Sequence, residues 1–245
     1  MLNKKKINPW SWVPSLYFAE GLPYVIVITV ATIIYKNLGL SNTEITFYTG
    51  WLYLPWVIKP FWSPFIDNFR TKRFWVVVTQ IIMGALIACA GLSLPTDNFV
   101  KWSLIFFWLI AFSSATHDIA ADGIYMLALN SHEQSFFVGI RNTFWRIAAI
   151  TGQGGLVYIS GLLIKENVSI KTAWMIILIS TGIIYFIIGI YHKFIIPHSD
   201  SDPEKSLAGA KDTIIKYLST FISFFKKKGF ILFLLFVLLY RLGEA

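Results

Sequence analysis

Six apolar stretches of membrane-spanning length constrain the fold of this chain more than any other feature of its sequence. They cover about residues 12–35, 43–65, 74–94, 102–129, 136–163 and 173–195. About 20 apolar residues in an α-helix cross the hydrocarbon of a bilayer, and a helix satisfies its own backbone hydrogen bonds there. The sequence therefore predicts an all-α membrane protein whose first part is a bundle of six transmembrane helices.

The composition excludes a soluble protein. Hydrophobic residues make up 56% of the 245 residues, and only 14% are charged, whereas soluble domains have about 25% charged residues. The net charge of +8 would suggest a nucleic-acid partner in a soluble chain, but here the basic residues follow the topology and no nucleic acid is expected. The single cysteine, Cys89, permits neither an intrachain disulfide nor a cysteine-based zinc site, and no cofactor is predicted.

The distribution of lysine and arginine predicts the orientation of the bundle. If the N-terminus is cytoplasmic and the spans alternate, the outer loops carry only four basic residues: Lys36, Lys101, Lys165 and Lys171. The inner segments carry Lys4, Lys5, Lys6, Arg70, Lys72, Arg73, Lys193 and the six lysines of residues 198–228. The positive-inside rule therefore predicts a multi-pass protein with a cytoplasmic N-terminus.

After the sixth span the hydrophobic pattern changes. Residues 198–228 place an apolar face opposite most of their lysines, which is typical of an amphipathic helix on a lipid surface. Residues 229–245 are again apolar. We therefore expect a six-helix bundle over residues 1–197, a cytoplasmic linker over 198–228, and over 229–245 the first transmembrane helix of an incomplete C-terminal half.

Two carboxylates in the fourth span are the strongest functional signal. Asp118 and Asp122 are four residues apart, so they share one helix face about 6 Å from each other along the axis. The rest of that face is small or polar: Ala111, Ser114, Ala115 and Tyr125. Ionisable groups at membrane depth normally face a cavity or a partner and carry function. The alternative is a buried ion pair that only locks helices together.

A second polar stripe runs along the fifth span, where Asn142, Arg146 and Gln153 recur at helical spacing. An unpaired charge at this depth is unfavourable. We therefore expect Asp118 or Asp122 to lie within salt-bridge range of Arg146, with both groups facing a central cavity. Arg141 is nearer the end of the span, where we expect it to reach headgroups or the loop.

Shorter signals occur in the first three spans. The first span is interrupted at residues 20–23, Glu-Gly-Leu-Pro, where a membrane helix can open locally. Ser41 is a predicted helix cap with Glu44 three residues on. Lys59 either extends to the interface or faces a cavity. Gly84 and Ala88 give the third span a small-residue packing face.

Several motifs together resemble one branch of the major facilitator superfamily. They are SLYFAEGLP at residues 15–23, KPFWSP at 59–64 with Asp67, DIAADG at 118–123, and RNTFWR at 141–146. The branch contains the AmpG-type muropeptide permeases and the acetyl-coenzyme A transporters. The resemblance covers essentially the whole chain, and it implies the N-terminal half of a major facilitator fold.

The loop after the second span is similar to the superfamily's cytoplasmic gating motif. Ser63 stands where the motif has glycine, Asp67 matches its aspartate, and Arg70, Lys72 and Arg73 supply its basic cluster. The match is therefore partial, and the resemblance implies a gating role for these five residues.

The resemblance implies proton-coupled import of a peptidoglycan fragment (a muropeptide) across a bacterial inner membrane, with membrane lipids around the bundle. Another solute, such as an acyl-coenzyme A-like anion, stays open. Secondary transporters of this kind bind substrate between two halves, so we expect the chain to need a C-terminal half or a second copy. The candidates for proton coupling or substrate binding are Glu20, Asp118, Asp122, Arg146, Asn142, Gln153, His117 and Lys59.

Two other classes of function are alternatives to transport. A metal-dependent membrane enzyme would use His117, Asp118 and Asp122 as ligands. Phosphatidyl-alcohol transferases place their first two aspartates three apart and add a second pair, which this chain lacks. His132, His192 and His198 are in loops or at span ends, so we expect no metal site and no enzyme. A non-transporting receptor or scaffold is the third class.

Overall fold

The computed structural model describes residues 7–198 and scattered positions between 219 and 239. Between residues 7 and 198 the chain forms helices joined by short connections and contains no strand, as the sequence predicts. The expected amphipathic linker helix of residues 198–228 and the expected seventh span of 229–245 lie outside the described residues for most of their length.

Five of the six expected spans are long helices. The first joins η1 (Pro9–Ser11), α1 (Val13–Val25), η2 (Ile26–Val30) and α2 (Ala31–Asn37), and the third and fourth are α6 (Lys72–Ser93) and α7 (Phe99–Ala128). The fifth joins α8 (Ser131–Ile150), η5 (Thr151–Leu156) and α9 (Val157–Lys165), and the sixth is α10 (Ile170–Ile195). Each of these five is long and apolar enough to cross a membrane.

The second expected span is divided into short pieces. It consists of α3 (Asn42–Thr49), η3 (Gly50–Tyr53), α4 (Leu54–Ile58), η4 (Lys59–Phe61) and α5 (Ser63–Asn68). Pro55, Pro60 and Pro64 each remove a backbone donor and disfavour the preceding helical turn, so the segment is not one regular helix. The capping box expected at Ser41 and Glu44 begins this segment and is confirmed.

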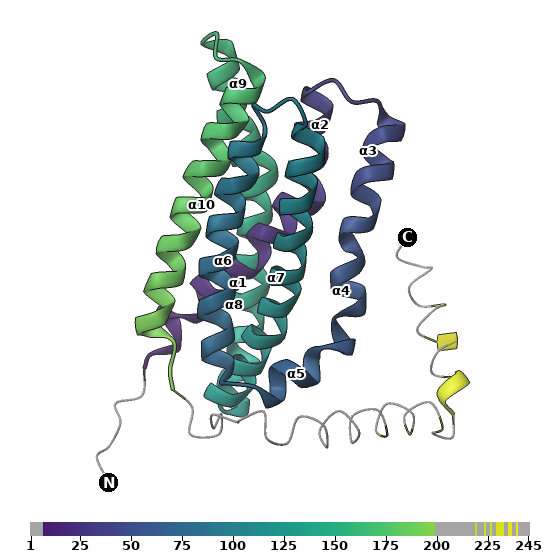
Figure 1. The fold of residues 1–245 in the computed structure, drawn as a ribbon. Coiled ribbons are helices and arrows are strands. Elements are labelled where there is room, and N and C mark those ends of the chain that lie inside the picture. The colour runs from purple at the N-terminus through teal and green to yellow at the C-terminus, as the bar shows by residue number, and fades with distance from the viewer. Residues whose placement is uncertain are drawn as a thin grey trace.

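The helices lie side by side in a bundle (Figure 1). In the bundle α6 packs against both α7 and α10, while α1 packs against α7 and α8. The divided segment from α3 to α5 stands beside α7, and α10 lies on the far side of the bundle (Figure 1). The first, second, fourth and fifth spans therefore meet around α1 and α7, and this arrangement positions the site described below.

The first span stays helical through Pro23, contrary to the expected opening at residues 20–23. Pro23 lacks an N–H, so the carbonyl of Ala19 has no donor four residues later. The hydroxyl of Tyr185 in α10 donates to this carbonyl at 2.6 Å, which satisfies the freed acceptor. The irregular turn comes later, in the π-helical η2. A tertiary contact that the local sequence does not reveal thus keeps the helix closed.

Small residues allow the closest helix contacts. A Cβ on Gly84 would lie 2.9 Å from the carbonyl oxygen of Gly182, and one on Gly182 would lie 2.8 Å from the nitrogen of Ala88. The packing face predicted from Gly84 and Ala88 is confirmed, and it joins α6 to α10. On the other side of the bundle, a Cβ on Gly152 would lie 2.6 Å from Val25 Cγ1, so α8 and η5 lie directly against the first span.

The connections alternate between the two ends of the bundle (Figure 1). Residues 69–71, 129–130 and 196–198 lie at the end where the first span begins, and residues 38–41, 94–98 and 166–169 lie at the other. Arg70, Arg73 and Lys193 lie near the first of these ends, so the positive-inside rule predicts that this end is cytoplasmic.

Cysteine labelling tests this orientation. In a Cys89→Ala background, a cysteine at Asn98 is expected to react with a membrane-impermeant maleimide added outside intact cells. A cysteine at Ser206, in the linker, is expected to react only after the membrane is permeabilised. Labelling of both positions from outside would contradict the orientation.

Candidate functional site

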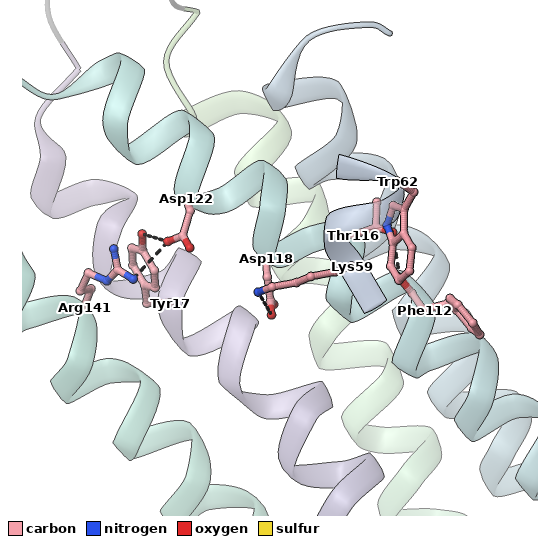
Figure 2. Close-up of polar contacts among 8 residues, drawn as sticks. All are labelled: Tyr17, Lys59, Trp62, Phe112, Thr116, Asp118, Asp122 and Arg141. Carbon is pink, nitrogen blue, oxygen red and sulfur yellow. Dashed lines mark hydrogen bonds and ion pairs between the residues drawn. The ribbon is translucent and has the colours of Figure 1, made fainter. Parts of the chain in front are cut away.

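The acidic residue Asp122 of α7 joins three helices. Arg141 of α8 approaches Asp122 Oδ1 with a guanidinium nitrogen at 3.1 Å, and the hydroxyl of Tyr17 in α1 donates to the same oxygen at 3.0 Å (Figure 2). The guanidinium also lies over the rings of Tyr17 and Tyr125, 4.5 and 5.2 Å from their centres. These contacts hold a paired but accessible carboxylate, because 45% of the Asp122 side chain is exposed.

The expected pairing of the acidic face with Arg146 is wrong. Arg141, which we expected near headgroups or the loop, is the arginine that reaches Asp122. Arg146 is exposed and makes no ion pair among the described residues. The face of α8 that packs on α1 carries Ala148 and Gly152, and at 100° per residue Arg146 lies nearly opposite Ala148.

The second acidic residue, Asp118, pairs with the divided span. Lys59 Nζ lies 3.7 Å from Asp118 Oδ2, and the two side chains are 36% and 14% exposed (Figure 2). Trp62 fixes this part of the divided span against α7, because its Nε1 donates to Thr116 Oγ1 at 3.2 Å. The sequence left open whether Lys59 extends to the membrane interface or faces a cavity. The structure favours the second position, because the helix breaks around Pro60 place Lys59 beside Asp118.

Glu20 is the third carboxylate of the site. It interacts electrostatically with both aspartates and with Lys59 and Arg141. Its Oε2 atom is buried without a hydrogen-bond partner among the described residues, as is Oδ1 of Asp118. Three carboxylates thus face two cations, and one negative charge is left without a matching positive charge when all five groups are ionised.

Aromatic side chains cluster around Tyr24, which is one helical turn after Glu20 on the first span. Tyr24 packs edge-on against Trp56 at 5.0 Å and Tyr53 at 6.4 Å, and it also contacts Trp145 of α8 at 5.7 Å between ring centres. Trp56 is almost fully buried, whereas 44% of Tyr53 is exposed. Tyr53 is therefore the ring of this cluster best placed to contact a bound molecule.

His117 belongs to a buried hydrogen-bonded chain and not to the open site. Gln80 Nε2 donates to His117 Nε2 at 2.9 Å, and Gln80 Oε1 accepts from His192 Nδ1 at 2.8 Å. Ser15 Oγ donates to His192 Nε2 at 2.8 Å. Gln80 and both histidines are completely buried. These hydrogen bonds link α7, α6, α10 and α1. His192, which we expected to be too far from His117 to share a site with it, is therefore joined to His117 through the amide of Gln80.

Sequence reasoning missed Gln80, although it is the only amide side chain in Lys72–Ser93 and a polar group at membrane depth is a signal in itself. Among the described residues, no group of three or more His, Cys, Asp or Glu side chains is positioned to hold a metal ion.

Gln80→Leu is expected to lower the free energy of unfolding by about 1–3 kcal/mol for each buried imidazole left without a partner. The measurement is thermal unfolding in detergent followed by intrinsic fluorescence. Gln153→Leu, at an exposed amide of η5, is the control and should change the midpoint little. Equal effects of the two substitutions would mean that the hydrogen bonds of Gln80 with the two histidines do not stabilise the bundle.

Lys72 is central to the segment that resembles the superfamily's gating motif. Its ammonium pairs with Asp67, and its side chain is buried against α7. A Cβ on Gly123 would lie 2.9 Å from Lys72 Cε and 3.0 Å from Cδ. The glycine that follows the acidic pair therefore makes room for the lysine stem, which connects the DIAADG motif to the gating loop. Ser63 Oγ donates to the carbonyl of Pro60 at 3.3 Å.

Gly123→Ala is expected to displace the Lys72 stem and break its contact with Asp67. Labelling with an amine-reactive reagent, quantified by mass spectrometry, should then modify Lys72 several-fold faster than in the unchanged protein. Gly161→Ala is the matched control, because nothing lies within 4 Å of that position. Unchanged protection of Lys72 in Gly123→Ala would contradict this account of the glycine.

Two other predicted residues lie apart from the charged cluster. Asn142 and Gln153 are exposed on the same side of α8 and η5 as Arg146.

Arg70 and Arg73, the remaining basic residues of the gating motif, lie at the end of the bundle. Arg73 Nε donates to the carbonyl of Ile196 at 3.0 Å, and the Arg70 guanidinium lies over the rings of Phe69 and Phe74.

Comparison with known proteins gives the family context. The family model described as Major Facilitator Superfamily matches residues 15–242. A Rickettsia conorii protein that carries the name transporter AmpG 4 is 24% identical over 245 residues, which cover 94% of this chain and 55% of that protein. An uncharacterized protein of Haemophilus influenzae is 25% identical over 237 residues, which cover 93% of this chain and 52% of that protein.

A third relative carries a more specific name. The anhydromuropeptide permease of Escherichia coli (strain K12) is 28% identical over 146 residues, which cover 57% of this chain and 29% of the permease. The chain spans about half the length of the first two relatives.

Proposed function

Because this chain belongs to the Major Facilitator Superfamily, we propose that it forms the N-terminal half of a secondary active transporter in a bacterial inner membrane, with a cytoplasmic N-terminus. The imported solute is a peptidoglycan fragment of the muropeptide class, and its import is driven by protons. The observation that carries this proposal is the charged cluster of three carboxylates and two cations, which four of the spans bring together at membrane depth.

Proton coupling is supported by the charge balance of the site. Lys59 and Arg141 each pair with one aspartate, which leaves Glu20 as the carboxylate of this cluster that has no ion pair among the described residues. Its Oε2 atom is also buried without a hydrogen-bond partner there. Binding one proton makes the cluster neutral, and a neutral cluster costs less at membrane depth than one with a net charge. We therefore assign the transported proton to Glu20, with Asp118 and Asp122 as the residues that respond to its charge.

Substrate binding is supported by the residues around this cluster. A muropeptide carries a sugar and peptide carboxylates, and an arginine fork binds a carboxylate through two parallel hydrogen bonds. Arg141 is therefore the proposed carboxylate ligand, released in part from Asp122 when substrate enters. Tyr53 offers an exposed ring for a sugar face. Asn142, Arg146 and Gln153 remain candidates for contacts made from the exposed face of α8.

The second wall of the transport pathway is proposed to come from a C-terminal half or from a second copy of this chain. Transporters of this architecture bind substrate between two halves and expose it alternately by rocking them. An acyl-coenzyme A-like anion is the alternative solute, because the two cations would also suit a phosphorylated ligand. The receptor and metal-enzyme alternatives gain no support from the described residues.

Uptake of a radiolabelled anhydro-muropeptide by proteoliposomes under an imposed pH gradient tests the proposal. The protein is reconstituted both as this chain alone and as a complete transporter, in which a C-terminal half accompanies the chain. Accumulation above empty liposomes that collapses with a protonophore is expected for the complete protein. Accumulation that is unchanged by the protonophore would show that import is not driven by protons. Accumulation of a coenzyme A thioester, and not of the sugar peptide, would show that the acyl-coenzyme A-like anion is the transported solute.

The chain alone is expected to give no uptake, because it supplies one wall of the pathway. Uptake by the chain alone, abolished by Asp122→Asn, would show that two copies form the transporter.

A further inference from the structure

A groove with a basic end and an apolar wall lies between α6 and α10, apart from the charged cluster. It has a volume of about 340 Å³. Arg73 and Lys193 line its end, and Phe74, Val77, Val78 and Ile81 line its wall. We propose that this groove binds the phosphate headgroup and the adjoining acyl chain of an anionic phospholipid from the cytoplasmic leaflet. The proposal rests on the orientation assigned above and not on the transported solute.

The basic end is preorganised by contacts between the two helices. Arg73 Nε donates to the carbonyl of Ile196 at 3.0 Å, Nη1 lies 2.6 Å from His198 Nε2, and Nη2 donates to the carbonyl of Lys193. A guanidinium has five N–H donors, so two remain for another acceptor. Lys193 is exposed, and its ammonium has no acceptor among the described residues. The guanidinium of Arg70, over the ring of Phe74 at 5.6 Å, adds positive charge at the rim.

The wall is apolar over the length that an acyl chain needs near its headgroup. From Phe74 to Ile81 the helix rises about 10 Å. The surrounding surface of α6 and α10 is apolar as well, with Ile82, Ile190 and Phe194 exposed. A surface of this kind on a membrane-spanning bundle faces hydrocarbon, so a ligand there must combine an apolar chain with a polar end.

Charge complementarity selects an anionic lipid. The groove is basic, and no acidic residue is among the described residues that line it. Arginine and lysine bind phosphate oxygens through charge-assisted hydrogen bonds. Basic pockets between transmembrane helices on the cytoplasmic side bind anionic headgroups, and each basic residue near the surface contributes about 1 kcal/mol. A zwitterionic lipid carries a cationic group that two basic side chains would repel.

Another occupant would be the chain itself. Asp200, Asp202 and Glu204 follow His198 in the sequence, and their carboxylates also complement a basic groove. An apolar wall about 10 Å long suits an acyl chain better than this acidic stretch, and for this reason we favour the lipid. The experiment below separates the two occupants.

Native mass spectrometry of the delipidated chain in detergent, with lipid added back, tests the proposal. Phosphatidylglycerol is expected to bind and to raise the unfolding midpoint, and phosphatidylcholine is not. Lys193→Gln should weaken phosphatidylglycerol binding by about fivefold, the loss expected for one basic group at the membrane surface. Lys165→Gln, an exposed lysine at the opposite end of the bundle, is the control and should not change it.

Three outcomes would overturn the proposal. Equal binding of the two lipids, or equal effects of Lys193→Gln and Lys165→Gln, would show that the groove does not select an anionic headgroup. Competition by inorganic phosphate alone would indicate a site for a free anion. If phosphatidylglycerol binds only after Asp200→Asn, Asp202→Asn and Glu204→Gln are combined, the linker occupies the groove. None of these measurements depends on uptake, so a failure here leaves the proposed transport function to its own test.

Discussion

Glu20→Gln is expected to abolish uptake driven by a pH gradient in the complete transporter while leaving substrate exchange intact. Glutamine imitates the protonated form of the acid permanently, and the cluster with three carboxylates and two cations then stays neutral. The protein can still bind and move substrate, but it cannot release a proton on the inner side. Uptake under the gradient should fall to the level of empty liposomes, whereas exchange of labelled for unlabelled substrate across the membrane should continue.

Two comparisons make this experiment decisive. Glu166→Gln replaces an exposed glutamate in the connection before α10 and should leave both activities unchanged. Asp118→Asn leaves Lys59 without its carboxylate and should reduce uptake and exchange together, because it removes a partner of a partly buried charge. Uptake under the gradient that survives Glu20→Gln would exclude Glu20 as the proton carrier, and a loss of exchange as well would give it a role in binding.

Arg141→Gln is expected to weaken muropeptide binding by about 10- to 100-fold, the loss of a charge-assisted hydrogen bond of about 1.5–3 kcal/mol. The substitution also leaves the Tyr17 hydroxyl as the remaining hydrogen-bond partner of Asp122 among the described residues. Arg141→Lys should recover only part of the affinity, because a lysine keeps the charge but loses the planar fork and much of the stacking on Tyr17 and Tyr125. Binding is measured by quenching of tryptophan fluorescence, with the unfolding midpoint as a check of folding.

Arg146→Gln on the same helix is the comparison that separates the two arginines. It should weaken binding less than Arg141→Gln, because no ion pair is lost among the described residues. Lys165→Gln should have no effect on binding. A larger loss with Arg146→Gln than with Arg141→Gln would restore the residue that the sequence pattern first favoured and would contradict the assignment made from the structure.

The acidic pair could be predicted from the sequence because its chemistry is local. Two aspartates four residues apart in an apolar segment share a helix face whatever surrounds them, and a charge at membrane depth demands a partner. The same reasoning could not choose the partner. Arg141 and Arg146 lie five residues apart on α8, and the choice depends on which side of α8 packs against α1. Gly152 against Val25 and the contact of Gly21 with Trp145 decide that side, and both are tertiary contacts.

The buried hydrogen bonds that connect Ser15, His192, Gln80 and His117 could not be predicted from the sequence either. Each of these four residues is visible in the sequence as a polar residue in or near an apolar span. Their distances along the chain, 177 residues between Ser15 and His192 and 112 between Gln80 and His192, give no local pattern to read. Hydrogen bonds between side chains of different helices are set by how the helices cross, and packing of side chains at the contacts sets the crossing.

What the sequence by itself determined is the membrane class, the all-α fold and five of its long apolar helices, because these follow from hydrophobic length and helical period. Only the tertiary structure decided that Pro23 leaves its helix closed, that Lys59 faces Asp118, and that Gly123 makes room for Lys72. In each case the deciding group comes from another helix: the Tyr185 hydroxyl, a carboxylate of α7, and the stem of a lysine. Such contacts arise when apolar faces pack together, and a local pattern does not contain the partner.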